Sequence, residues 1–253
     1  VIGQNDATAN TTTTVIRATR TSGTNATGTN TYIQGSTGSG TGTGGSLIFQ
    51  TANSNTPQFV YSNTQTSGSV TSYTFSFYVP SNLVNKLLML QIVYGSNTAA
   101  DASSTTYAGT NLTSLSSVGN SSLGTRVSIW YLTAPASGTN NIVITIPVAA
   151  TITAIPSVWQ NVNQINSFSG SVSSTTSPST NPIATGSTAV IDLAIDFLVI
   201  PVASSATMGT GQILNNNAAN ASFNMYSSYK IGAAGVTTMS ATVTPYSNLT
   251  YLG

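Results

Sequence analysis

The most strongly patterned stretch of the chain, residues 126–147 (RVSIWYLTAPASGTNNIVITIP), contains two apolar runs separated by turn residues. Side chains alternate along residues 127–132 and again along residues 142–146, where every second residue is isoleucine. An alternation of period two predicts strands that bury one face. Pro135, Ser137 and Gly138 break the pattern between the runs, so we predict a β-hairpin whose isoleucine face needs a second sheet to cover it.

Four further stretches predict strands of different kinds. Residues 69–80 alternate aromatic and polar side chains, which is typical of a half-buried strand. Residues 86–94 (KLLMLQIVY) are apolar on both faces, so we expect a central strand covered on both sides. Residues 189–202 place five large apolar side chains inward and two aspartates outward. Residues 151–159 predict a strand whose Pro156 marks an edge or a bulge, because proline cannot donate to a ladder.

The remaining patterned segments complete an all-β chain. Residues 221–231 and 236–244 predict a closing hairpin around residues 232–235, and residues 249–252 predict a last short strand. Residues 100–120 are rich in Ser and Thr and predict a loop. No stretch combines helix caps with a 3.6-residue period over three turns. The fold class expected is all-β, an antiparallel β-sandwich of jelly-roll or Ig-like type.

The N-terminal part differs in composition from the rest and predicts an extended arm. Residues 1–30 are polar and contain one short apolar cluster in TTTTVIRATR, residues 31–66 are a Gly/Thr-rich connecting segment with short strands, and residues 67–253 are the sandwich. The arm is a candidate donor strand, which would complete the sheet of a neighbouring subunit through backbone hydrogen bonds. A frayed terminus and an ordinary first strand are the alternatives. The candidate assembly residues are Val15, Ile16, Arg17, Ala18 and Thr19.

Charge is almost absent from this chain. It has 253 residues, 40% of them apolar, which is enough to fill a core, and only 4% are charged, against roughly 25% in an ordinary soluble domain. The net charge is +1 and the five cations are scattered, so we expect no nucleic-acid or anionic-lipid partner. No apolar run is long enough to insert into a membrane. The sequence begins at Val1 rather than Met, so we expect a processed, secreted form, with a sequence that lacks its first residues as the alternative.

The chain lacks the side chains that most catalytic and metal sites use. It contains no Cys, His or Glu, which excludes nucleophilic triads and the usual metal clusters, so we predict no catalytic site and no cofactor. Asp192 and Asp196 share a strand face but lie about 13 Å apart at about 3.3 Å per residue. Glycosidase pairs need roughly 5 to 9.5 Å. A Ca²⁺ site that combines one of these carboxylates with loop carbonyls is the alternative to a polar outer face.

Two other kinds of site are compatible with the sequence. Exposed aromatic side chains can bind sugars, and the candidates for surface-glycan contact are Trp130, Trp159, Tyr107, Tyr226 and Tyr229, with a place in the core as the alternative for each. Asn-X-Ser/Thr sequons are about as frequent as chance predicts in this composition, so glycosylation is permitted rather than indicated. The candidate acceptors are Asn10, Asn25, Asn111, Asn120, Asn220 and Asn248.

Three low-complexity runs resemble known modules. Residues 22–52 (SGTNATGTNTYIQGSTGSGTGTGGSLIFQTA) are similar to glycine-rich segments of tailed-phage fibre and virion-surface proteins. Residues 106–168, with TYAGTNLTSL and VWQNVNQINSF, and residues 211–251, with FNMYSSYKIGAAGVTTMSATV, resemble the β-sandwich modules of virion-surface and secreted prokaryotic surface-filament proteins. The resemblance implies the fold and an extracellular setting. It assigns no catalytic or binding residue.

These observations together predict a role in building rather than in catalysis. We expect a non-enzymatic extracellular structural subunit that assembles with copies of itself into a filament, a pilus-like thread or a virion appendage by β-strand donation, on the cell surface or the virion surface. A carbohydrate- or receptor-binding adhesin module is one alternative. A virion decoration or surface-layer protein is the other. Because few groups titrate between acidic and neutral pH, we also expect acid to change the net charge very little, which suits an extracellular protein in a harsh medium. The alternative is that a repetitive β protein rich in Thr, Ser and Asn drifts to this composition without selection for acid.

Overall fold

The computed structural model of the chain describes residues 56–95, 101–165, 173–174, 180–188, 192–232, 235–245 and 249–252. All regular structure in these residues is β-strand, and every pairing is antiparallel. The prediction of an all-β antiparallel fold is confirmed. Within this part of the chain no helix is long and apolar enough to cross a membrane. The predicted arm and its residues 15–19 lie outside the described residues.

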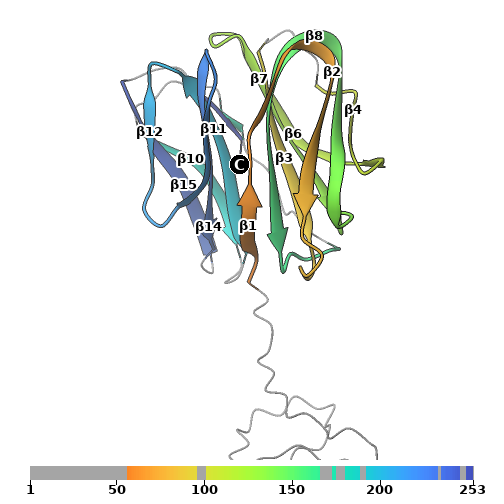
Figure 1. Cartoon of the computed structure of the whole chain (residues 1–253). Helices are drawn as coiled ribbons and strands as arrows, with labels where there is room; N and C mark the ends of the chain where they lie inside the picture. Colours follow the sequence, from red (N-terminus) through yellow and green to blue (C-terminus); the bar gives the residue numbers. More distant parts are fainter. Residues whose placement is uncertain are drawn as a thin grey trace, which may run out of the picture. The chain divides into compact units, whose positions relative to one another are not determined.

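The first half of the described chain forms one eight-stranded sheet that curls until it nearly closes on itself (Figure 1). Its order is β5-β4-β8-β3-β7-β6, and β1 and β2 also pair with β8. The first half of the long strand β8 pairs with β4 and the end of β2, and its second half pairs with β3, β1 and the start of β2. The strands are β1 (Gln58–Ser62), β2 (Gln65–Val79), β3 (Leu87–Tyr94), β4 (Ser104–Tyr107), β5 (Thr110–Asn111), β6 (Thr113–Asn120), β7 (Thr125–Thr133) and β8 (Gly138–Gln160).

The second half forms two smaller sheets. A five-stranded sheet has the order β13-β14-β11-β16-β9, and a three-stranded sheet has the order β10-β15-β12. The strands are β9 (Ser173–Ser174), β10 (Thr180–Thr188), β11 (Leu193–Pro201), β12 (Ser205–Met208), β13 (Ile213–Ala219), β14 (Phe223–Ile231), β15 (Gly235–Thr244) and β16 (Thr250–Leu252). β1 lies within the predicted connecting segment 31–66, and the three predicted segment boundaries stay predictions.

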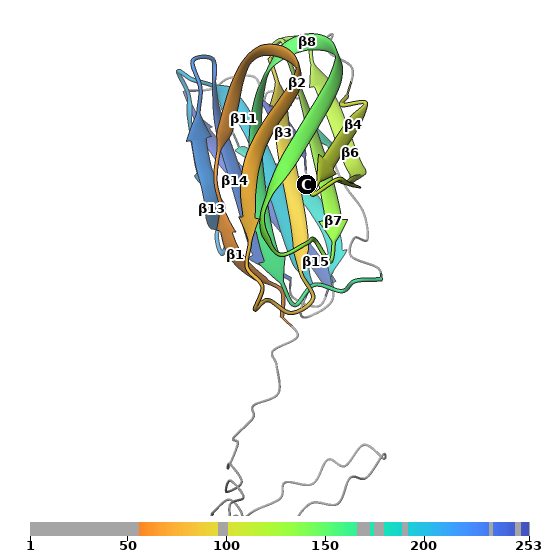
Figure 2. The ribbon, with the colours of Figure 1, turned by 45° about the vertical axis from the view of Figure 1, so that its right-hand side comes forward.

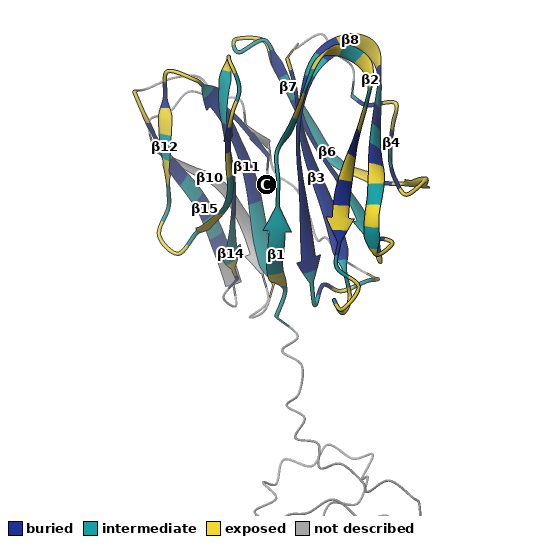
Figure 3. Cartoon of the chain, in the orientation of Figure 1, coloured by how far each residue is buried: buried dark blue, intermediate teal, exposed yellow. Residues whose placement is uncertain are grey.

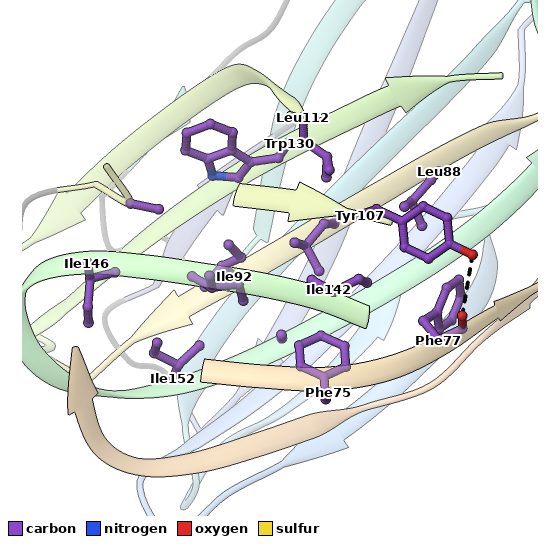
Figure 4. Close-up of a cluster of buried hydrophobic side chains, with 14 of the residues drawn as sticks. Phe75, Phe77, Leu88, Ile92, Tyr107, Leu112, Trp130, Ile142, Ile146 and Ile152 are labelled. Atoms are coloured by element: carbon purple, nitrogen blue, oxygen red, sulfur yellow. Dashed lines mark hydrogen bonds between the residues drawn. The ribbon is translucent and has the colours of Figure 1, made fainter. Parts of the chain in front are cut away.

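Three apolar clusters lie between the layers. The inner cluster fills the curl of the eight-stranded sheet, where β2, β4 and the first half of β8 face β3, β7 and the second half of β8 (Figure 4). The middle cluster lies between the other face of β3, β7 and β8 and the five-stranded sheet. The outer cluster lies between the five-stranded and three-stranded sheets. Strands β3 and β11 therefore contact an apolar cluster on each face.

Strand β3 confirms the prediction of a strand covered on both sides. All eight of its residues are buried (Figure 3). Leu88 and Leu90 belong to the inner cluster, whereas Leu87 and Met89 belong to the middle cluster. Side chains of neighbouring β3 residues are thus buried on opposite faces of the strand, in two different clusters.

Strand β11 is also covered on both faces, which the sequence did not predict. Phe197 and Val199 belong to the middle cluster, and Leu198 and Ile200 belong to the outer cluster. The predicted polar outer face is wrong at Asp196, which is only 1% exposed. The reason is that the three-stranded sheet packs over the face on which the aspartate lies.

The predicted hairpin in residues 126–147 is wrong, although both of its strands are present as β7 and β8. Strand β3 lies between them, so that Leu90 is opposite Trp130 on one side and Pro156 on the other. The layers on either side of the sheet cover the two apolar faces of β3, and its two neighbouring strands pair with both of its backbone edges. The turn residues pass the start of β3, where the Ala134 N–H donates to the Lys86 carbonyl at 2.9 Å.

The predicted closing hairpin is wrong for a similar reason. Strand β14 pairs with β11 and β13, and β15 pairs with β10 and β12, so the chain crosses from one sheet to another between them. The hairpin in this region is β13–β14, closed where the Asn220 N–H donates to the Phe223 carbonyl at 2.9 Å. The short strand predicted at residues 249–252 is confirmed as β16. Residues 100–120, predicted as a loop, contain β4, β5 and β6.

Pro156 lies inside β8 rather than on an edge strand. Its carbonyl accepts a hydrogen bond from the Asn63 N–H at 3.3 Å. The N–H and C=O of a strand residue point to the same side of the strand. A residue with an N–H at position 156 would therefore direct it toward residues 63–64, which connect β1 to β2. No ladder bond is required there, which explains how a proline fits a strand that has neighbours on both sides.

The two-sided burial of β3 can be tested with two adjacent substitutions. We expect Met89→Ala and Leu90→Ala each to lower the free energy of unfolding by about 2–5 kcal/mol, because each leaves a cavity in a different apolar cluster. Urea denaturation provides the measurement. Val148→Ala, at a side chain that is 56% exposed, is the control and should change the free energy little. A strand buried on one face only would show a large loss for just one of the two.

Candidate functional site

The structure separates the two predicted carboxylates. Asp192 is exposed and precedes β11, whereas Asp196 lies buried in the middle of that strand. Among the residues that the structure describes, no three His, Cys, Asp or Glu side chains come together as a metal site would require. Asp196 therefore has to be understood from its own neighbours.

Hydrogen-bond donors surround the Asp196 carboxylate. Oδ1 accepts from the Ser228 N–H at 3.0 Å and from the Ser228 hydroxyl at 2.5 Å, directly across the β11–β14 ladder. Oδ2 accepts from Gln212 Nε2 at 3.2 Å. A calcium ion would need oxygen ligands at the positions that these N–H and O–H groups occupy. The surroundings of Asp196 therefore suit a buried acid better than a cation site.

Gln212 extends this polar group from the five-stranded sheet to the three-stranded sheet. Its Nε2 also donates to the Ser228 hydroxyl at 2.9 Å, and its Oε1 accepts from the Ser240 N–H of β15 at 2.6 Å. Gly209 lets β15 approach, because a Cβ at this position would overlap the Ser240 hydroxyl. Asp196, Ser228 and Gln212 thus form a hydrogen-bonded group, the Asp196 group, that links the five-stranded sheet to the three-stranded sheet. Elsewhere these two sheets meet through apolar side chains.

Burial dominates the electrostatics of this group. It raises the pKa of Asp196 to about 7, although the hydrogen bonds from Ser228 and Gln212 act in the opposite direction. Burial, with the Asp196 charge as the second cause, also raises the pKa of the Tyr251 hydroxyl. The expectation that almost nothing titrates between acidic and neutral pH missed Asp196. Since its carboxylate is sealed from solvent, it can influence stability but cannot reach a dissolved substrate.

A second carboxylate makes an ion pair at the surface of the eight-stranded sheet. Arg126 holds Asp101 with two hydrogen bonds, Nε to Oδ1 at 2.7 Å and Nη2 to Oδ2 at 2.9 Å, and the Ser117 hydroxyl donates to Oδ2 at 2.7 Å. These bonds from Arg126 lower the pKa of Asp101. The side chain of Arg126 is 27% exposed and that of Asp101 is 34% exposed, so solvent screens the pair and limits its contribution to stability.

Most of the aromatic residues considered for sugar binding lie in the core. Trp130, Trp159, Tyr107 and Tyr226 are buried, which confirms the alternative considered for each of them. Tyr229 is partly exposed, and its ring centroid lies 5.2 Å from that of Trp159 in an edge-on contact.

The sequons differ in their surroundings. Asn111 is exposed, whereas Asn120 is 3% exposed and its Nδ2 donates to the Leu249 carbonyl at 2.8 Å. The folded protein therefore does not offer the Asn120 nitrogen to which a glycan would be attached. Asn220 uses its Oδ1 to accept from the N–H groups of Ser222 and Phe223 in the β13–β14 turn. Asn10, Asn25 and Asn248 lie outside the described residues.

The feature that sequence reasoning missed altogether is a seam between two sheet edges. β1 is at one edge of the eight-stranded sheet and β13 is at one edge of the five-stranded sheet, and they lie side by side (Figure 2). Side chains join them where the Ser62 hydroxyl donates to the Asn215 carbonyl at 2.9 Å and Asn216 Nδ2 donates to the Ser62 hydroxyl at 3.0 Å. No backbone ladder between them occurs in the described residues. Neither strand has a charged side chain. The order of apolar and polar residues along the two strands does not indicate that these two edges meet.

One end of this seam opens into an apolar groove of about 360 Å³. It is lined by Phe59 of β1, by Ile213 of β13, and by Tyr229 and Ile231 of β14, with residues 56–58 at its rim. Ile213 is 52% exposed and Ile231 is 39% exposed. The groove has no charged lining residue, so it suits an apolar partner. We name it the seam groove.

The two shifted carboxyl groups predict an unusual pH profile. The folded state binds the Asp196 proton more tightly than the unfolded chain does, so stability should fall as the pH rises from about 4 to about 7, by at most about 1.4 kcal/mol per pH unit. Asp101 has the opposite effect, because its lowered pKa stabilises the folded state above about pH 4 and that contribution is lost at lower pH. Urea unfolding across this range should therefore show maximal stability near pH 4.

Two conservative variants separate these contributions. Asp196→Asn should remove the loss between about pH 4 and 7, whereas Asp101→Asn should leave that loss in place and weaken the protein only above about pH 4. If Asp196→Asn and the unchanged protein lose stability equally between about pH 4 and 7, the assignment to Asp196 is wrong.

No family model, curated protein or solved structure matches this chain. The resemblance to fibre and surface-filament modules stays a prediction, and the function has to be argued from the seam, the buried acid and the near absence of charge.

Proposed function

We propose that this chain is a non-enzymatic extracellular structural subunit that assembles with copies of itself into a filament, a pilus-like thread or a virion appendage. In this proposal its sheets form a β-sandwich and its first residues form an extended arm. The observation that carries the proposal is the uncharged sheet edge of β13 beside an open apolar groove. Such an edge is what strand donation between subunits requires.

Monomeric β proteins usually protect their edge strands against pairing with other chains. They place lysine, proline or a bulge there. Strand β13 (ILNNNAA) has no charged residue and no proline. It has a bulge at Asn215, and the two residues that precede the bulge, Ile213 and Leu214, are exposed. The first two residues of this edge therefore lack the usual protection, which favours assembly over a solitary monomer.

The near absence of charge also supports assembly. With a net charge of +1, copies repel one another weakly and can approach closely at any salt concentration. The sealed Asp196, which favours the folded state in acid, supports a place outside the cell in an acidic medium. The adhesin alternative has less support, because four of its five aromatic candidates are buried.

Truncation of the arm tests the proposal. Deletion of residues 1–20 should leave a folded monomer that no longer polymerises, because the donor strand is gone while the described sheets are complete. Negative-stain electron microscopy and size-exclusion chromatography measure assembly, and urea unfolding measures the fold. Normal polymers formed by the truncated chain would contradict strand donation.

Point substitutions provide a milder version of the same test. Val15→Asp combined with Ile16→Asp should abolish assembly, because burying a carboxylate in a partner's apolar site is costly. The matched control is Thr29→Asp with Thr31→Asp, which adds the same charge outside the proposed donor segment and should assemble normally. Equal loss in both variants would point to charge alone rather than to residues 15–19.

A further inference from the structure

We infer that the seam groove is the acceptor site for residues 15–19 of a second copy of this chain. This inference rests on the proposed function and adds to it the place where the donor binds. It follows from the lining of the groove, the state of its two edges and the point at which the N-terminal segment reaches the described structure.

The lining of the groove continues the middle apolar cluster. The Phe59 ring centroid lies 5.2 Å from that of Trp159, which is fully buried, and Phe59 and Tyr229 pack against that cluster while remaining partly exposed. Ile213 and Ile231 surround the opening. The middle apolar cluster is thus exposed to solvent at the groove, where no polar side chain in the described part of the chain covers it. An apolar segment that bound across the groove would bury these lining side chains.

The two edges at the groove still have backbone groups to offer. Among the described residues β1 pairs only with β8, and β13 pairs only with β14. Side-chain hydrogen bonds close the seam at Ser62 and Asn216, beyond the β13 bulge, and leave residues 58–59 and 213–214 at the open end. An incoming strand can hydrogen-bond along such an edge and insert every second side chain into the groove.

The chemistry of the N-terminal segment matches this opening. Fifty-five residues precede the described structure, and the chain enters it at Thr56 and Pro57, on the rim of the groove itself. Within that segment the β-branched pair Val15 and Ile16 suits a strand, and residues 15–19 contain no anion. We assign the donor to a second copy because a subunit that filled its own groove would offer no acceptor site to a growing polymer.

Cysteine cross-linking tests this assignment cleanly, because the chain contains no cysteine of its own. Two double variants combine Ile213→Cys with Val15→Cys or with Ile16→Cys, and oxidation after assembly should join neighbouring subunits of one of them into a covalent ladder on a non-reducing gel. The control variant Ile16→Cys with Val148→Cys places the second thiol at a side chain that is 56% exposed in the bend of β8, and should give no ladder. A disulfide forms only where two Cα atoms lie about 4.4–6.8 Å apart.

Each result has a definite meaning. Neighbouring residues of a strand point to opposite faces, so only one of Val15→Cys and Ile16→Cys should cross-link strongly to position 213. A cross-linked monomer instead of a ladder would overturn the inference, since the chain would then fill its own groove. Normal polymers without a cross-link in either variant would overturn the groove but not the proposed function, whereas failure of the unchanged protein to polymerise would overturn both.

A second variant tests the groove without disulfides. Ile213→Asp should reduce the polymer yield by about tenfold or more and leave urea unfolding nearly unchanged, because this side chain is half exposed in the monomer. Val148→Asp is the matched control and should keep the yield. Full assembly by Ile213→Asp would contradict the assignment of the seam groove.

Discussion

The burial of β3 and β11 on both faces is the constraint from which the rest of the architecture follows. An antiparallel strand that is apolar on both faces must have a layer above it and a layer below it. β3 obtains these layers from the curl of the eight-stranded sheet on one side and from the five-stranded sheet on the other. β11 obtains them from the eight-stranded and three-stranded sheets. Stacking three sheets around two such strands leaves sheet edges side by side, and the seam between β1 and β13 is one result.

The sequence predicted the kind of structure better than its connections. Alternation identified β7, β8 and β16, and the two-sided apolar run identified β3, because these signals depend on local periodicity. Which strands become neighbours depends on the whole set, so β3 separates β7 from β8, and β14 and β15 belong to different sheets. The Ser/Thr-rich strands β4 to β6 had no apolar pattern to reveal them.

The candidate sites show the same limit. The absence of His, Cys and Glu could be read directly from the sequence, and it excluded nucleophilic triads and the usual metal clusters. The burial of Asp196 could not be predicted, because the sheet that covers it combines strands from before and after it in the chain, and alternation alone suggested an outer face. The seam groove is also invisible in sequence, since β1, which supplies part of its lining, lies about 150 residues before the β13–β14 hairpin that supplies the rest. Thr56 and Pro57, where the N-terminal segment ends and the described structure starts, are among its lining residues, and this links the architecture to assembly.

Hydrogen exchange of the β13 amides tests the central claim, that an open sheet edge becomes a subunit contact, most directly. Neighbouring amides of a strand point to opposite sides, so one of the Ile213 and Leu214 amides faces β14 and the other faces the open edge. The amide that faces the open edge should be protected in assembled full-length chains and should exchange rapidly in monomers that lack residues 1–20. The amides of β3 should be slow in both preparations and provide the internal reference. Equal, rapid exchange of the amide that faces the open edge in polymers and monomers would contradict the account.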